Sequence, residues 1–121
     1  MCLEKVDKIT KKGTGIGYKV FARDGVGGIK PTDSEITRYK LNRWYKDKRT
    51  LPIKTRGNHY PTGYHIFVNK EDALILNNEI RTARRVKYSD VVASGTQDTT
   101  KSWGTRVIVA RKMYIYPKKE L

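Results

Sequence analysis

The sequence has few of the residues that form covalent cross-links or metal sites. Its 121 residues include one cysteine and two histidines. A single cysteine cannot form an internal disulfide and cannot build a zinc site of several thiolates. His59 and His65 have no neighbouring cluster of carboxylates or thiolates, which makes them poor metal ligands. We therefore expect no structural disulfide, no metal and no cofactor.

Long apolar runs are also missing. No stretch approaches the roughly 20 apolar residues that a helix needs to cross a bilayer. Met1 to Lys8 contains charges where a secretion signal would have its apolar segment, so we expect no such signal. The length predicts a single domain over residues 1–121. We expect this domain in the cytoplasm, without membrane contact.

Acidic residues are scarce relative to basic ones. Twelve Asp and Glu stand against 26 Lys and Arg, giving a formal net charge of +14. Such a charge attracts polyanions and makes the chain repel itself. The densest basic segment runs from Arg38 to Arg56, and Tyr39, Trp44 and Tyr45 lie among its cations. Cations beside flat aromatic rings suit a ligand with phosphates and bases. The alternative is a solvated hairpin whose basic side chains cover the edge of the core.

Further basic clusters lie at Arg81–Lys87 and around the last apolar run. The indole of Trp103 lies in a polar segment, where we expect it either to close over a nucleoside or to pack on its own domain. The candidate ligand-binding residues are Arg43, Trp44, Tyr45, Lys46, His65, Arg84, Arg85, Lys101, Trp103 and Arg106.

The alternation of apolar residues predicts a β-rich domain. Strands are expected at 18–22, at 36–41 with a return from Trp44 after a turn, at 63–68, at 85–88 and 91–93 around a kink, and at 106–116. The last of these is the longest run and the expected central strand. Residues 46–62 and 94–104 have loop-like composition.

One helix is expected. Asn69 is a suitable N-cap, and Glu71 and Asp72 lie in the first turn, where the helix dipole favours anions. Together with the apolar residues that follow, they predict a helix over about 70–77. The fold class is therefore α+β, a mainly antiparallel twisted sheet with one short helix packed on it.

Signatures of catalysis are weak. The glycines from Gly13 to Gly17 precede a predicted strand, and Tyr18 separates them from Lys19, unlike the phosphate-binding loop that opens a helix. No G-x-S-x-G nucleophile elbow is present. His65 is a candidate general base, and the alternative is a hydrogen-bonded structural histidine. An enzyme is therefore the less favoured interpretation.

Several segments resemble a group of small uncharacterised accessory proteins of tailed bacteriophages. The segments are Tyr18–Phe21, Trp44-Tyr45, Tyr60–Phe67 followed by Glu71-Asp72-Ala73, and Val91–Gly95. Small phage proteins of this size commonly act against host defence, some by sequestering nucleotide immune signals and others by blocking nucleases. The resemblance implies such a role, in the cytoplasm of the host bacterium. Its motifs are scaffold-like and imply no site residue.

These observations favour a non-enzymatic anti-defence protein that sequesters a phosphate-bearing nucleotide signal of host immunity. The first alternative is a nucleic-acid-binding protein, which requires a continuous basic face where a trap requires a closed pocket. The second is a small nucleotide-cleaving enzyme that uses His65 for acid–base chemistry. The expected partner is an anionic nucleotide or a nucleic acid, and a homo-oligomer is compatible with the sequence.

Overall fold

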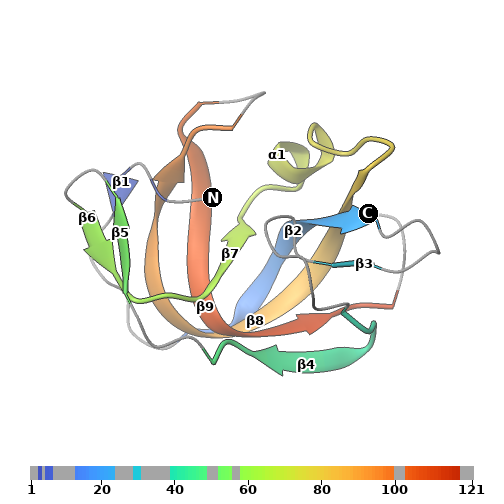
Figure 1. The fold of residues 1–121 in the computed structure, drawn as a ribbon, viewed down its shortest axis with the longest axis horizontal. Helices are drawn as coiled ribbons and strands as arrows, with labels where there is room; N and C mark the ends of the chain where they lie inside the picture. The colour runs from blue at the N-terminus through green and yellow to red at the C-terminus, as the bar shows by residue number, and fades with distance from the viewer. Residues whose placement is uncertain are drawn as a thin grey trace.

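The computed structural model describes residues 3, 5–6, 13–23, 29–30, 39–48, 52–55, 58–99 and 103–117 (Figure 1). The elements in chain order are β1 (Lys5–Val6), β2 (Gly15–Arg23), β3 (Ile29–Lys30), β4 (Arg43–Lys46), β5 (Ile53–Thr55), β6 (Asn58–Tyr60), β7 (Tyr64–Phe67), α1 (Lys70–Leu74), β8 (Arg81–Gln97) and β9 (Thr105–Ile115). The mainly antiparallel sheet with one short helix confirms the expected α+β class. The one helix of the described part has five residues and is too short and polar to cross a membrane.

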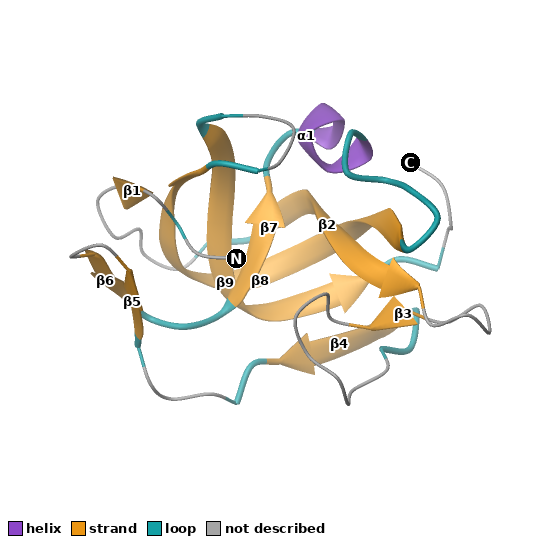
Figure 2. Ribbon diagram, turned by 45° about the horizontal axis from the view of Figure 1, so that its top comes forward, coloured by secondary structure: helices purple, strands orange, loops and turns teal. Residues whose placement is uncertain are grey.

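The main sheet closes on itself. Its strand order is β1-β8-β2-β7-β9-β4, with β3 beside β2, and a further pairing joins β8 to β9. The strands β8, β2, β7 and β9 therefore form a closed circuit, and every pairing in it is antiparallel. A small separate hairpin contains β5 and β6. Helix α1 and strand β4 lie at opposite sides of the circuit in both views (Figures 1 and 2).

Strand β8 closes the circuit by pairing with both β2 and β9. Its first half pairs with β2, and residues from Val86 to Gln97 pair with β9. Asp90 has a φ of 57°, and the register with β9 shifts between Val91 and Ala93. This is the behaviour of a β-bulge, which bends a strand and increases its twist. The sequence correctly places a kink at Ser89-Asp90, but the strand continues through it.

The buried apolar side chains of the sheet form two clusters. One cluster of buried residues includes Val20, Phe67 and Val107, and the other includes Phe21, Ile66 and Met113. Neighbouring residues of a strand point to opposite faces, which is why Phe67 and Ile66 fall into different clusters. The same alternation in β2 puts Val20 in one cluster and Phe21 in the other.

Two glycines allow close packing inside the circuit. A Cβ atom on Gly17 would lie 2.4 Å from Cγ2 of Ile66 and 2.8 Å from the carbonyl oxygen of Phe67. A Cβ on Gly63 would lie 2.7 Å from the carbonyl oxygen of Ala110. Gly17, in the glycine-rich start of β2, is therefore needed for close packing of the strands.

Three sequence predictions need correction. Residues 46–62, expected to be mostly loop, include the β5–β6 hairpin, whose Tyr60 is buried. Residues 94–97 belong to β8 and not to a mobile loop. The helix ends at Leu74. The strand predicted at 106–116 is central as expected, because β9 has β8 on one edge and β7 and β4 on the other. It is not the longest strand, since β8 is longer. The strand predicted at 36–41 lies largely outside the described residues, and β4 pairs with β9.

Candidate nucleotide-binding face

The exposed side chains of β4, β9 and β8 form rows across the sheet. Directly opposed residues of antiparallel strands point to the same face. The first row joins Trp44, Tyr114 and Lys87 across these strands. The second joins Lys46, Lys112 and Ser89 in the same way. Two positions along a strand separate the rows, which is about 6.6–6.8 Å.

A third row begins just after β9. The backbone N–H of Tyr116 donates a hydrogen bond of 3.3 Å to the carbonyl of Arg85, continuing the β8–β9 register. Ile16 of β2 pairs with Lys87 and extends the first row. We call the whole surface the Trp44 face. Its members are Ile16, Trp44, Lys46, Arg85, Lys87, Ser89, Lys112, Tyr114 and Tyr116.

Aromatic rings form a continuous line on this face. The indole of Trp44 is 47% exposed and lies 5.6 Å from the ring of Tyr114, tilted by 51°. Tyr114 in turn meets Tyr116 edge to face at 5.2 Å. The hydroxyl of Tyr114 is hydrogen-bonded to the side-chain oxygen of Asn42, in the turn before β4. These contacts hold the rings in place and leave much of the indole open to solvent.

Cations flank the aromatic line. Lys46, Arg85 and Lys87 are exposed, and the side chain of Lys112 is partly so. The Nζ of Lys112 lies 3.4 Å from Oδ2 of Asp90, and both side chains remain more than one-third exposed. Such a solvated pair contributes about 0–1 kcal/mol and is readily exchanged for another anion. Lys112 therefore remains able to contact a phosphate.

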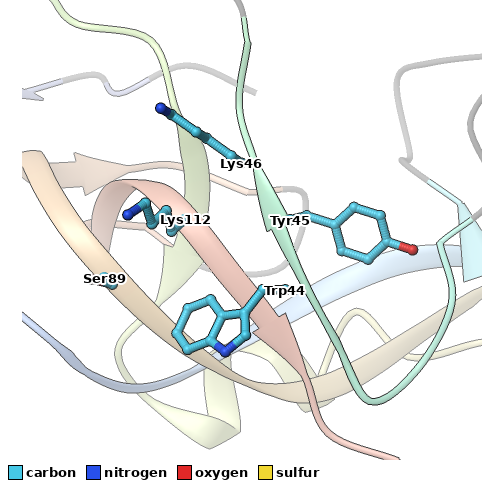
Figure 3. Close-up of a pocket in the computed structure, with 5 residues that line it drawn as sticks. All are labelled: Trp44, Tyr45, Lys46, Ser89 and Lys112. Atoms are coloured by element: carbon cyan, nitrogen blue, oxygen red, sulfur yellow. The ribbon is translucent and has the colours of Figure 1, made fainter.

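A shallow hollow opens between the first two rows. Its volume is about 400 Å³, and its lining comprises Trp44, Tyr45, Lys46, Ser89 and Lys112 (Figure 3). The ring of Tyr45 points away from the side chains of Trp44 and Lys112. It packs instead against Tyr39, with the ring centroids 4.8 Å apart. Its hydroxyl accepts a hydrogen bond of 2.6 Å from the Lys40 N–H.

The structure thus separates residues that are neighbours in the sequence. Trp44 and Lys46 share the Trp44 face, whereas Arg43 and Tyr45 point to the opposite side of β4. Arg85 lies on the face, but Arg84 is 4% exposed and belongs to the interior. The basic character of both segments is visible in the sequence, and the strand alternation decides which cations share a face with Trp44.

Other candidate residues lie away from this face. Trp103 is 86% exposed just before β9, and Arg106 is exposed at its start, whereas Tyr114 lies near its end. The structure therefore places the two tryptophans at opposite ends of β9. Lys101, proposed from the sequence beside Trp103, lies outside the described residues.

His65 takes part in a hydrogen-bond chain with the N-terminal segment. Its Nε2 is 2.9 Å from the hydroxyl of Tyr60, which accepts a bond of 2.9 Å from the backbone N–H of Leu3. Tyr60 is 2% exposed and Leu3 is buried. This arrangement supports the structural interpretation of His65. Within the described residues, no group of three or more His, Cys, Asp or Glu is placed to hold a metal ion.

Sequence reasoning missed six of the nine residues of the Trp44 face. Lys87, Lys112, Tyr114 and Tyr116 were not among the candidate residues, although three of them alternate at every second position near the chain's end. That period of two indicates one face of a strand. It does not reveal that this strand lies beside Trp44, which requires the β4–β9 pairing.

Comparisons with protein-family models, with curated proteins and with solved structures found no significant match. The function is therefore argued from the chemistry of the Trp44 face.

Proposed function

We propose that this protein binds nucleic acid through the Trp44 face, without catalysis. The observation that supports this most is the register itself. It places exposed Trp44 in one line with the half-buried rings of Tyr114 and Tyr116, and it places Lys46, Lys112, Lys87 and Arg85 around them. Cations next to phosphates release condensed counterions, and this supplies most of the affinity for a polyanion. Aromatic rings add stacking with bases of any sequence.

The openness of the face favours a polymer over an enclosed small molecule. The hollow beside Trp44 is shallow and open to solvent, and the aromatic line continues past it to Tyr116. A closed trap buries most of its ligand. An open row of rings and cations instead lets a chain continue beyond the site at both ends.

The test is binding of a labelled mixed-sequence oligonucleotide at 50 and 200 mM salt. We expect affinity to fall steeply with salt. The slope of log K against log salt is negative, and each lost phosphate contact makes it less steep by about 0.7–0.9. Lys46→Ala combined with Lys87→Ala should therefore make the slope less steep by up to twice that amount.

A matched control removes two exposed cations that are not members of the Trp44 face. Lys54 is exposed on β5, and Arg81 is exposed at the start of β8. Lys54→Ala combined with Arg81→Ala changes the net charge equally and should retain most of the affinity and slope. Equal losses in the two double variants, or no binding at 50 mM salt, would refute the proposal.

A second candidate function is sequestration of a free nucleotide, as the phage resemblance implies. The hollow of about 400 Å³ favours it, because small-molecule sites span roughly 300–1,000 Å³. Its lining offers an indole for a base and two lysines for phosphates. Mass spectrometry of small molecules released from the purified protein by heat distinguishes the two functions. A stoichiometric, chemically intact nucleotide would favour sequestration.

A further inference from the structure

We infer that the ligand of the Trp44 face is single-stranded nucleic acid, with one base stacked on Trp44 and its phosphate on the Lys46–Lys112 row. This inference rests on the proposed function and specifies its ligand.

The arrangement of the rings argues for unpaired bases. In a duplex both faces of each base are covered by its neighbours, and a protein reaches the phosphates and the base edges in the grooves. An exposed indole lying on a sheet gains stacking energy with a base that is free to leave its neighbours. Trp44 is exposed yet held by Tyr114, so little side-chain freedom remains to be lost on binding.

The spacing of the rows fits a single nucleotide. The lysine row lies two residues along the strands from the Trp44–Tyr114 row, a distance of about 6.6–6.8 Å. A nucleotide has its phosphate and its base at opposite ends of a sugar. With the base on Trp44, the phosphate therefore falls beside Lys46 and Lys112. On the far side of the aromatic row, Arg85 and Tyr116 offer a cation and a ring to the neighbouring nucleotide.

The experiment compares three ligands of equal length: a 12-nucleotide oligo(dT), an abasic phosphodiester strand and a 12-base-pair duplex. The abasic strand keeps the charge and removes the bases. We expect oligo(dT) to bind at least about fivefold more tightly than the abasic strand, since stacking of one base is worth roughly 5- to 150-fold in affinity. The duplex should bind more weakly than oligo(dT), and its affinity should depend on salt but not on the Trp44 ring.

Trp44→Ala tests the stacking position, with Trp103→Ala as the matched control. Trp44→Ala should weaken oligo(dT) binding by about 5- to 150-fold and leave binding of the abasic strand unchanged. Trp103→Ala should preserve the ratio between the two ligands. Circular dichroism should show the same fold in both variants, because both indoles are exposed.

Fluorescence gives an independent readout of the same contact. In a Trp103→Phe variant, Trp44 is the single tryptophan, since the chain has two. Oligo(dT) should quench its emission and the abasic strand should not. Equal affinity for oligo(dT) and the abasic strand, or for oligo(dT) and the duplex, overturns the inference while nucleic-acid binding stands. If none of the three ligands binds at 50 mM salt, the proposed function fails as well.

Discussion

At the scale of single residues, hydrogen-bond partners decide what each candidate side chain can do. Strand alternation predicts that His65 and Phe67 point one way and that Tyr64 and Ile66 point the other, and the core clusters confirm this for Phe67, Tyr64 and Ile66. The partner of His65 is not predictable in this way. Its contact with Tyr60 depends on the turn between β6 and β7 and on the β5–β6 hairpin, which the composition of the segment conceals.

The hydroxyl of Tyr60 provides a residue-scale prediction. Tyr60→Phe removes the acceptor of the buried Leu3 N–H and the partner of His65 Nε2. A buried donor left without an acceptor costs about 1–3 kcal/mol. The free energy of unfolding, measured in urea, should therefore fall by that amount.

A matched change tests whether the hydroxyl and not the ring is responsible. Tyr116→Phe alters a half-buried tyrosine at the sheet surface and should change the free energy of unfolding by less than about 0.5 kcal/mol. An unchanged midpoint in Tyr60→Phe would show that the Leu3–Tyr60–His65 chain does not stabilise the fold.

At the scale of elements, the strands that could be predicted have regular alternation or a compact apolar run. The strand at Tyr64–Phe67, the helix start at Asn69 and the central strand near the C-terminus all follow from such patterns. The end of β8 does not, because Ser94 and Gln97 are polar yet buried. Closure of the sheet gives these polar residues strand partners on β9, and a local composition window cannot detect that.

Strand β9 provides the element-scale prediction. Val109 is fully buried and pairs with His65 on one side and Ala93 on the other. Val109→Asp places an unpaired carboxylate there, at a cost of several kcal/mol, similar to the whole stability of a domain. We expect the variant to lack a cooperative thermal transition by circular dichroism. Val109→Ile, which keeps the site apolar, should retain one. A soluble, cooperatively melting Asp variant would show that this strand is not central.

At the scale of the whole molecule, the net charge of +14 is the dominant property. The sequence alone predicts an anionic partner. It cannot show which cations share a surface, because β4 and β9 are far apart in the chain and Lys46 meets Lys112 through their pairing. Excess positive charge opposes the compact state through self-repulsion, and salt screens that repulsion.

The unliganded protein should therefore become more stable as salt is added. We expect the Tm to rise between 20 and 300 mM sodium chloride, the range over which the Debye length falls below about 10 Å. A second series with glucose at the same osmolality serves as the control. Glucose is uncharged, so it cannot screen the repulsion, and any rise in Tm that it causes comes from solute exclusion. A Tm that falls with salt would mean that attractive ion pairs outweigh the repulsion.

The position of β4 has a dynamic consequence for binding. Among the described strands β4 pairs with β9 alone, whereas Tyr114 and Lys112 lie on β9, which also pairs with β8 along its length and with β7 over its first half. The Trp44 face is thus assembled from one strand that can open locally and another that opens only with the whole domain. The apparent affinity is the intrinsic affinity multiplied by the fraction of molecules in which β4 is closed. A ligand bound to both strands would hold β4 closed. Hydrogen exchange at the amides of residues 43–46 should therefore slow far more than exchange at the amides of β9.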